Sequence, residues 1–425
     1  MTAVPATAPP RPVDGPVADG RPERSSSPAG PLRIGPHEVP TPVVLAPMAG
    51  ITGEAYRTLC REQMAAAGGE GVFVSEMVTS RALVERTKES LRLVAHAPGV
   101  RLRSTQVYGV EPRTVGAAVR VLVEDDLADH VDLNFGCPVA KVTRRGGGAA
   151  LPWKSSLFAS VVREAVRAAA PAGVPVTVKM RVGIDAEHET YLDAGRAAEA
   201  EGAAAVALHA RTAEQYYSGT ADWSRIARLK EAVTSVPVLG NGDVWSGEDG
   251  VRMVAETGCD GVVVGRGCLG RPWLFADLAA AFAGRPERVR PTLGEVAAML
   301  HRHAVLLAAE HGAGVGQPLS DVTDVDEDRA CREIRKHVAW YLKGFPVGSS
   351  VRQRLALVPS LDALAEVLAE LDPDAPWPGD DAEGPRGRTA ATKRVALPHQ
   401  WLDSRELTGE AARMVADAEA SVSGG

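Results

Sequence analysis

The stretch His130-Val131-Asp132-Leu133-Asn134-Phe135-Gly136-Cys137-Pro138 is the most informative part of this chain. A short apolar strand runs into Asn134, and a Gly-Cys-Pro turn then exposes one thiol at the strand end. A structural cysteine normally lies among aliphatic side chains and not between a glycine and a proline. We therefore interpret Cys137 as a reactive group whose chemistry depends on its neighbours in the fold.

Similar apolar runs recur on both sides of this stretch and alternate with segments of helical periodicity. Strands are expected at 43–47, 72–76, 102–107, 131–134, 174–180, 205–209, 236–240 and 261–265, and helices at 113–124, 157–170, 191–200, 224–233 and 246–257. An α/β pattern of eight such units over about 250 residues is typical of a (β/α)8 TIM barrel. A doubly wound open sheet is the alternative fold, but the even spacing and the count of eight favour the barrel.

The chain divides into four expected parts. Residues 1–31 are rich in proline and serine and predict a disordered N-terminal arm, and residues 32–290 form the barrel. Residues 291–371 show helical apolar spacing and predict a C-terminal all-helical domain. We expect the acidic insert 321–328 to be a solvated loop and residues 372–425 to be a poorly ordered tail.

Composition limits the class of protein. Five scattered cysteines without a CxxC pair argue against a disulfide framework or structural zinc site, and we assign no metal ligands. No run of about 18 uncharged apolar residues and no apolar signal segment occur, so we expect neither a membrane span nor secretion. The cysteine usage fits a reducing cytoplasm, and we expect a cytoplasmic monomer. The net charge of −7 by itself disfavours a nucleic-acid partner.

Unusual polar and glycine residues gather where the expected strands end, which in a barrel is the active-site face. They are Pro47, Met48, Ala49, Glu76, Gln106, Asn134, Cys137, Lys179, Arg181, His209, Arg211, Asn241, Gly242, Asp243, Gly265 and Arg266. Each of them alone also fits an ordinary turn or a satisfied polar position. Their common location at one barrel mouth is what favours an active site.

The turns after the seventh and eighth strands indicate a phosphate site, because such loops bind phosphate through glycine N–H groups. The segment Gly265-Arg266-Gly267-Cys268-Leu269-Gly270 also satisfies GxGxxG, but no second strand follows it as a dinucleotide-binding unit requires. One phosphate, with Lys179 and Gln106 suited to a polarised ring edge, favours flavin mononucleotide (FMN). Cys137 then serves as a general acid, because a thiol is mostly protonated at neutral pH.

Together these residues resemble the tRNA-dihydrouridine synthase family, in its bacterial B-type form, over residues 33–371. The strongest match is 132–138 followed by Lys141 and 146–151; segments 47–50, 178–181, 208–212, 241–243 and 265–267 follow in family order. Phe135 and Ala210 depart from the family's more usual Met and Gly, and neither change removes a functional group.

The resemblance implies FMN as cofactor, NADPH as reductant, and reduction of the C5–C6 double bond of specific uridines in tRNA. It implies that hydride reaches C6 from the reduced flavin, that Cys137 gives the proton to C5, and that Asn134 helps to hold the uracil. It further implies that FMN is bound by Pro47, Met48, Ala49, Gln106, Lys179, His209, Asn241, Gly242, Asp243, Gly265 and Arg266.

Local charge departs from the acidic average. Residues 332–354 carry six basic side chains against Glu333 alone, and Lys141, Arg144, Arg181 and Arg211 lie near the expected catalytic loop. Phosphate contacts need such clusters, while salt screens remote acidic groups within about 10 Å. We therefore expect tRNA contacts from these four side chains and from Arg335 and Lys336, although a plain solvated helix face remains an alternative for the last two.

Two other functions stay open at this point. A flavin barrel reductase for a free pyrimidine would not need the basic helical domain. An RNA-binding protein without activity would lack the acid and the flavin ligands, so Cys137 and Lys179 argue against it.

Overall fold

The computed structural model describes residues 30–317, 319–387 and 391–407, together with 409, 412, 413 and 415. Eight parallel strands close into a barrel in the order β10-β3-β4-β5-β6-β7-β8-β9. Their bounds are β3 Val43–Leu45, β4 Val72–Thr79, β5 Ser104–Tyr108, β6 His130–Phe135, β7 Val176–Arg181, β8 Ala205–His209, β9 Val238–Asn241 and β10 Gly261–Val264. The predicted TIM barrel is confirmed, and the open sheet is excluded because β10 pairs with β3.

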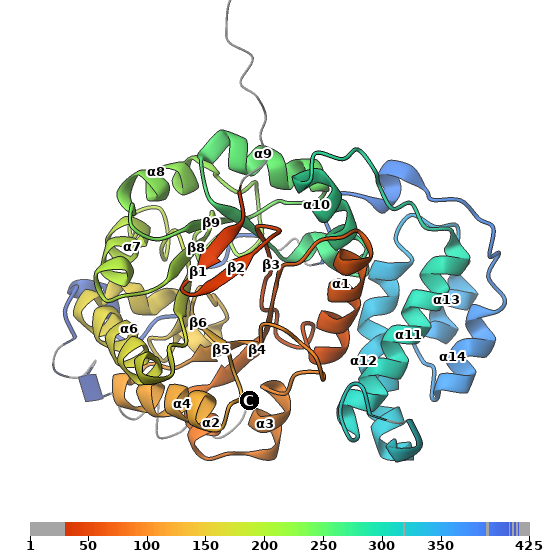
Figure 1. The fold of residues 1–425 in the computed structure, drawn as a ribbon, viewed down its shortest axis with the longest axis horizontal. Coiled ribbons are helices and arrows are strands. Elements are labelled where there is room, and N and C mark those ends of the chain that lie inside the picture. The colour runs from red at the N-terminus through yellow and green to blue at the C-terminus, as the bar shows by residue number, and fades with distance from the viewer. Residues whose placement is uncertain are drawn as a thin grey trace, which may run out of the picture.

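A two-stranded hairpin that the sequence analysis did not predict covers one end of the barrel. Strands β1 (Leu32–Ile34) and β2 (His37–Val39) pair antiparallel around Gly35, whose φ of +55° suits glycine. Leu32, Ile34 and Val39 are buried against inward-facing barrel residues such as Val44 and Val263. Figure 1 shows this hairpin across the centre of the barrel. The active-site face is therefore the opposite, carboxyl end of the strands.

Helices surround the barrel, and their apolar faces pack on the strands. Their bounds are α1 Glu54–Ala66, α2 Ser80–Val84, α3 Lys88–Leu93, α4 Pro112–Glu124, α5 Ala140–Thr143, α6 Ser155–Ala169, α7 Tyr191–Ala200, α8 Ser224–Ala232, α9 Gly247–Thr257 and α10 Leu274–Phe282, with short 3₁₀ turns at 148–153, 170–172 and 266–268. Within the described residues no strand follows β10. This agrees with the rejection of a dinucleotide-binding unit at the GxGxxG segment.

The helical domain packs beside the barrel, next to α1 (Figure 1). It contains α11 Leu293–His311, α12 Asp324–Tyr341, α13 Ser349–Leu355 and α14 Leu361–Leu368. The predicted apolar positions Val296, Leu300, Ala304 and Leu307 are all buried in its core. The C-terminal helical part of the fold is therefore confirmed, whereas the exact domain boundaries stay a prediction.

The acidic insert is not the solvated loop that we expected. Thr323 caps α12, its side-chain oxygen accepting from the backbone N–H of Asp326, and the Asp326 carboxylate accepts from the backbone of Thr323 in return. Asp324, Asp326 and Glu327 thus form the first turn of α12, where negative charge is favoured by the helix dipole. The charged run is therefore the N-terminal signal of a helix and not a loop.

The segment after residue 372 also differs from the poorly ordered tail that we expected. Arg386 is buried and donates to backbone carbonyls of Trp340 and Ala382, and Trp401 is only 1% exposed. Apolar anchors that are widely spaced among Pro, Gly and Asp carry no periodic signal, which is why the sequence did not reveal this packing. The expected disordered arm falls almost wholly on residues 1–29, outside the described residues.

Candidate active site

The carboxyl ends of the strands bring most of the predicted site residues together. Parallel register places Asn134 of β6 beside Lys179 of β7, and His209 of β8 beside Asn241 of β9. Arg181 lies beside His209 in the same register. Residues that are 28 to 45 positions apart in the sequence therefore share one barrel mouth, as the barrel hypothesis requires.

A directed chain of hydrogen bonds runs from the barrel interior to the cysteine turn. Gln106 Nε2 donates to Asp132 Oδ2 at 2.6 Å, and Asn134 Nδ2 donates to Gln106 Oε1 at 2.8 Å. Asn134 Oδ1 then accepts the backbone N–H groups of Gly136 at 3.1 Å and Cys137 at 3.0 Å. Because each amide must present one end as donor and the other as acceptor, Asp132 fixes the direction of the whole chain.

Lys179 lies inside the barrel, at the centre of its mouth. Its Nζ donates to Asn241 Oδ1 at 3.0 Å, while Asn241 Nδ2 donates to the Val263 carbonyl at 2.7 Å. Burial, together with the nearby Arg181 cation, lowers the pKa of Lys179 to about 8. Burial likewise raises the pKa of Asp132 to about 6, although hydrogen bonds from Thr177 and Gln106 oppose that shift. The interior thus holds a cation and an anion that can both change protonation near neutral pH.

Cys137 is half-buried, whereas Cys60, Cys259, Cys268 and Cys331 are buried. Its carbonyl accepts the N–H of Ala149 at 3.0 Å, and Arg181 Nε donates to the preceding Gly136 carbonyl at 2.9 Å. Burial raises the pKa of the Cys137 thiol above its ordinary value. A thiol in this position stays protonated at neutral pH and is suited to giving a proton.

The turns after β8 and β9 form a cationic corner. Arg211 Nη2 donates to the Asp243 carboxylate at 2.8 Å, and its Nε donates to the Ser218 carbonyl at 3.1 Å. Within the part of the chain that the structure describes, the buried Nη1 of Arg211 has no hydrogen-bond partner. Gly242 has a φ of +131°, and a Cβ there would lie 3.8 Å from this Nη1. The corner therefore offers a backbone turn and an unused cationic donor, the requirements of a phosphate site.

Arg266 completes this corner from the turn after β10. Its guanidinium lies 4.4 Å from the ring centroid of Tyr217, and its Nη2 is 3.5 Å from Asp243 Oδ1. His209 is buried beside it, and burial together with the surrounding Arg181 and Lys179 cations lowers its pKa well below the ordinary value. His209 is therefore a neutral ring. A Cβ on Gly265, next to Arg266, would lie 3.6 Å from Ala46 Cβ and 3.8 Å from Met48 Sδ, which is ordinary contact distance.

The predicted tRNA contacts do not all lie on the surface. Arg181 and Arg211 are buried, and Arg181 Nη1 donates to the carbonyls of Thr212 at 2.9 Å and Tyr216 at 2.8 Å. Lys141 in α5 and Arg144 directly after it are exposed. Both belong to the segment 136–150 after β6, which we call the catalytic loop. The structure thus separates these four cations into two buried side chains at the mouth and two exposed ones on the loop.

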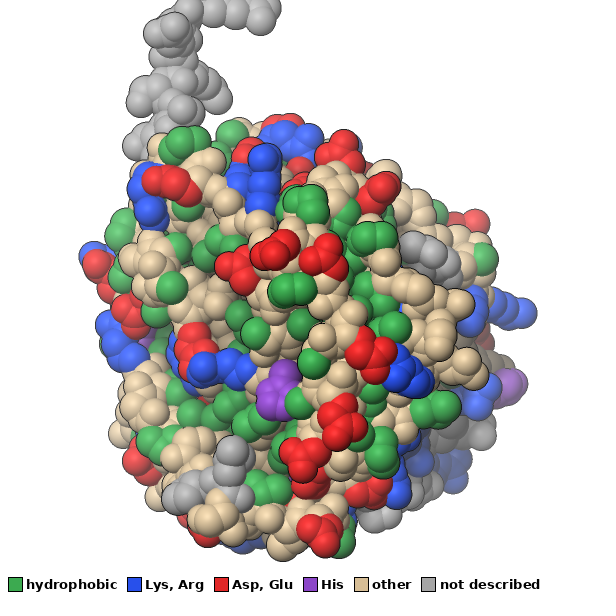
Figure 2. Space-filling view, turned by 90° about the vertical axis from the view of Figure 1, so that its right-hand side faces the viewer, with side chains coloured by type: hydrophobic (Ala, Val, Ile, Leu, Met, Phe, Trp, Pro, Cys, Tyr) green, Lys and Arg blue, Asp and Glu red, His purple; other side chains and the backbone are tan. Residues whose placement is uncertain are grey.

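The two cations of the helical domain also differ from each other. Arg335 Nη2 donates to the Val358 carbonyl at 2.7 Å and fastens α12 to the segment after α13. Lys336 is exposed, pairs with Glu333 at 2.9 Å, and has its Nζ 3.5 Å from the position of a Cβ on Gly50. Lys336 therefore reaches the first turn of the barrel mouth. Figure 2 shows acidic and basic side chains mixed over the right-hand side of the molecule in Figure 1, where the helical domain lies.

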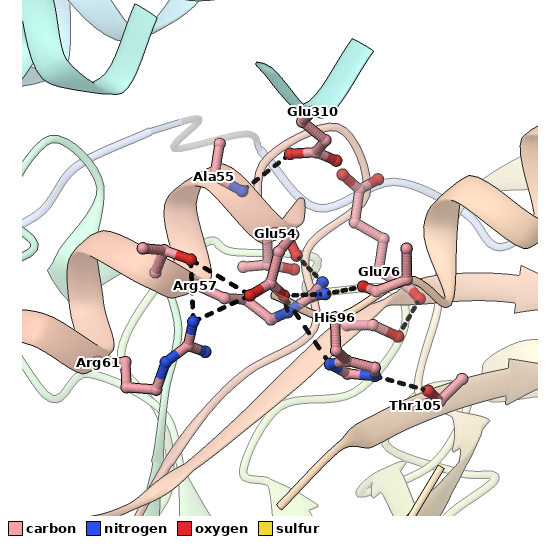
Figure 3. Close-up of polar contacts among 12 residues, drawn as sticks. Glu54, Ala55, Arg57, Arg61, Glu76, His96, Thr105 and Glu310 are labelled. Carbon is pink, nitrogen blue, oxygen red and sulfur yellow. Dashed lines mark hydrogen bonds and ion pairs between the residues drawn. The ribbon is translucent and has the colours of Figure 1, made fainter. Parts of the chain in front are cut away.

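A buried polar network that the sequence did not reveal joins the helical domain to the barrel (Figure 3). Glu310 Oε2 of α11 accepts the Ala55 N–H at the start of α1, at 2.8 Å, and Glu310 Oε1 accepts from Arg92 at 2.8 Å. Glu76, within β4, accepts the Gly50 N–H, and burial raises its pKa to about 7. The sequence predicts Glu76 as a residue of the barrel mouth. It does not reveal Glu310, because an acid within a helix normally indicates a solvated face.

Among the helices of the described residues, none is long and apolar enough to cross a membrane. In the same ranges, no three His, Cys, Asp or Glu side chains lie together in an arrangement that would hold a metal ion.

The sequence of the barrel and of the helical domain matches one protein family. Residues 44–372 match the family model described as "Dihydrouridine synthase (Dus)". A "Probable tRNA-dihydrouridine synthase" of Mycobacterium tuberculosis is 55% identical over 381 residues, which cover 89% of this chain and 94% of that protein. The "tRNA-dihydrouridine synthase B" of Xanthomonas campestris is 36% identical over 321 residues, which cover 76% of this chain and 90% of that protein.

The family-model match begins within β3 and includes the other seven barrel strands and the helical domain. The two relatives are matched over 94% and 90% of their own length. The mouth described above, with its half-buried cysteine and cationic corner, lies within the matched region. The chain belongs to the tRNA-dihydrouridine synthase family.

Proposed function

We propose that this protein reduces the C5–C6 double bond of uridines in tRNA, with FMN as its cofactor and NADPH as reductant. The observation that carries the proposal is the placement of the Cys137 turn by Asn134 at the mouth that also holds Lys179. Membership of the family supports the tRNA substrate. The flavin, the reductant and the residue roles rest on the chemistry of the mouth.

The residues present fit an FMN molecule. A phosphate at the cationic corner would satisfy the unpartnered Nη1 of Arg211. Glycine at 242 permits the φ of +131° and the close packing of the turn, since a Cβ there would lie 2.6 Å from Ala221 Cβ. We assign the phosphate to Gly242, Asp243, Gly265, Arg266 and the neutral His209, and we add Arg211 to this set. Its burial favours contact with a bound cofactor over contact with a tRNA backbone.

The ring system would lie over the centre of the mouth, between the turn Pro47–Ala49 and the polar residues Gln106, Lys179 and Asn241. Bound FMN, once reduced, supplies the hydride for C6 of the uracil. Lys179 contributes a positive charge where negative charge develops on the ring edge, and Asn241 holds its Nζ at 3.0 Å. The side chain of Gln106 is already committed to Asp132 and Asn134, so its role is to fix the direction of the chain that reaches Cys137.

Cys137 gives its proton to C5 of the uracil. Addition of hydride at C6 leaves enolate-like charge on the C5–C4–O4 unit, and transfer of the Sγ proton to C5 neutralises it. The raised pKa keeps the thiol protonated until that moment. The resulting thiolate regains a proton from solvent, and NADPH provides the two electrons of each turnover.

The target uridine must leave its stack to reach a barrel mouth. Lys141 and Arg144 on the catalytic loop and Lys336 on α12 are exposed cations on two sides of the mouth. We propose that these three side chains contact tRNA phosphates, and that Asn134 contacts the uracil. We also propose that the protein acts as a monomer.

One experiment tests the proposed function directly. The purified protein is examined for a flavin absorbance spectrum and incubated with NADPH or NADH and with tRNA that lacks dihydrouridine. The expected result is a yellow protein that forms dihydrouridine in tRNA, detected as a mass increase of the nucleoside, with NADPH preferred. Absence of flavin, or turnover of free uracil without any product in tRNA, would contradict the proposal.

A further inference from the structure

Residues 393–406, which we call the C-terminal strap, cross the carboxyl face of the barrel beside the catalytic loop. The Lys393 N–H donates to the Glu214 carbonyl in the loop after β8, at 2.9 Å. Val395 is buried, and Trp401 is among the largest fully buried side chains of the described residues. Such burial of an indole in a segment of irregular structure indicates a specific docking position.

Trp401 packs on the glycine run of the catalytic loop. Gly146 has a φ of +75°, and a Cβ at this position would lie only 2.4 Å from the indole ring. The indole Nε1–H donates to the Ala150 carbonyl at 3.0 Å. The Trp401 ring and its N–H thus contact the loop at two points four residues apart, Gly146 and Ala150. Only glycine at position 146 allows the ring to approach so closely.

The strap is fastened again just beyond the loop. The buried Lys154 Nζ donates to the carbonyls of Ser404 at 2.6 Å and Glu406 at 3.1 Å, and it lies 4.9 Å from the Trp401 ring. Arg405 Nε donates to the Trp153 carbonyl at 3.0 Å, and the Arg405 carbonyl accepts the Ser155 N–H at 3.2 Å. The strap and the segment 146–155 therefore form one hydrogen-bonded unit.

The other side of the glycine run touches the catalytic residue itself. The Ala149 N–H donates to the Cys137 carbonyl, and a Cβ on Gly148 would lie 2.4 Å from that carbonyl and 3.2 Å from Cys137 Cβ. The glycine run is thus layered between Trp401 and Cys137. Any outward movement of Trp401 removes the support behind the backbone of Cys137.

We propose that Trp401 is a positioning residue for Cys137, which acts through the glycine run 146–148. This inference rests on the proposed role of Cys137 as the acid. Without the indole the loop loses its backing, the thiol becomes more mobile and more exposed, and the proton is less well aligned with C5. A misplacement of about 1 Å can cost about a hundredfold in rate.

The test compares Trp401→Ala, Trp401→Phe and His399→Ala; His399 is an exposed residue of the same strap. Alkylation by iodoacetamide is followed at each cysteine by mass spectrometry. Cys137 is the one cysteine of the five that is not fully buried, so its labelling rate reports the exposure of the catalytic loop. Labelling of the four buried cysteines reports unfolding. We expect Trp401→Ala to label Cys137 several-fold faster while the buried four stay unlabelled, and Trp401→Phe to give an intermediate rate.

In turnover assays, kcat should fall about tenfold or more in Trp401→Ala, with an unchanged KM for tRNA and an unchanged flavin spectrum. His399→Ala should match the parent in both assays. Unchanged labelling of Cys137 in Trp401→Ala would overturn the proposal. If that variant labels all five cysteines, Trp401→Phe decides: selective labelling of Cys137 supports the positioning role, and none overturns it. The labelling result stands apart from the proposed function, which fails instead if the parent protein forms no dihydrouridine.

Discussion

The side-chain oxygen of Asn134 accepts the backbone N–H of Cys137 at 3.0 Å, so the penultimate residue of strand β6 sets the position of the thiol. The same oxygen accepts the Gly136 N–H, and the Asn134 amide nitrogen is held by Gln106. Asn134 therefore links the rigid barrel wall to the first residues of the catalytic loop. A direct contact with the uracil must share a side chain that already makes four hydrogen bonds, the fourth from Nδ2 to Met77 Sδ at 3.5 Å.

Replacement of Asn134 by alanine is expected to lower kcat for dihydrouridine formation about tenfold to a hundredfold, because the Cys137 turn loses the side-chain oxygen that accepts both of its backbone N–H groups. Asn134→Asp keeps two acceptor oxygens but cannot donate to Gln106, and it should fall between the parent and the alanine variant. Single-turnover rates and flavin content measure the effect. Loss of flavin in proportion to activity would contradict a role confined to the cysteine turn.

Asp132 is expected to produce the acidic limb of the pH–rate profile. Its ionised form accepts from Gln106 and Thr177, and burial raises its pKa to about 6. As the pH falls through about 6, protonation removes one acceptor, and the hydrogen-bond chain to Cys137 loses its fixed direction. Turnover should therefore be lower below pH 6 than above it.

Asp132→Asn provides the matched control for this limb. An asparagine can direct its NH2 group toward Gln106, which then turns its own NH2 toward Asn134 and displaces the Asn134 oxygen from the cysteine turn. We expect a lower rate at pH 7 and no acidic limb near pH 6. A profile that keeps the limb at the same pH would show that another group produces it.

The barrel and most of its mouth could be predicted because they depend on local patterns. Eight apolar runs with polar ends specify the strands, and parallel register then brings Asn134, Lys179, His209 and Asn241 together without further information. Long-range packing left no such signal. Glu310 is one acid in an amphipathic helix, and its partners on α1 and α3 are more than 200 residues away in the sequence.

The same limit applies to burial and to the packing of the C-terminal segment. Burial of Arg181 and Arg211 depends on backbone carbonyls of the loop 212–219, which no residue type in the sequence reveals. Trp401 looked like one aromatic residue in a tail of low hydrophobicity, and its partner is a glycine, which offers no side chain to recognise. The acidic run 321–328 did contain a readable signal, since Thr323 and Asp326 have the spacing of a capping box.

The Cys137 thiol should control the upper part of the alkaline limb. Its acid form is the active one, and burial raises its pKa above the ordinary value near ~8.5, so loss of the thiol proton should lower turnover only above that value. Lys179, with a pKa of about 8, should cause an earlier decline as its positive charge is lost. Cys137→Ser should be slower at pH 7 and show only this earlier decline up to pH 10, because a hydroxyl keeps its proton there. Single-turnover rates of pre-reduced enzyme measure both declines, and an alkaline limb that is the same in Cys137→Ser and in the parent would contradict a thiol acid.

Arg211→Met should weaken FMN binding. The methionine keeps the length of the stem and removes the unpartnered Nη1, so a charge-assisted hydrogen bond worth roughly 1.5–3 kcal/mol is lost and the Kd rises about tenfold to a hundredfold. Titration of the flavin-free protein, followed by quenching of FMN fluorescence, measures it. Arg167→Met is the control, since Arg167 is 71% exposed and pairs with Glu164 on α6. Equal affinities in both variants would remove Arg211 from the phosphate site.

Lys336→Gln should weaken tRNA binding without changing the flavin spectrum. Lys336 is exposed and reaches Gly50 at the barrel mouth, whereas Arg335 holds the Val358 carbonyl, so its substitution would also disturb the packing of α12. Loss of one phosphate contact should raise the Kd severalfold and reduce the slope of log Kd against log salt by about 0.7–0.9. Arg332→Gln removes the same charge from α12 at a side chain that is 67% exposed and paired with Asp328. Binding measured at several salt concentrations should separate the two variants, and equal effects would mean that net charge, and not a contact at Lys336, determines affinity.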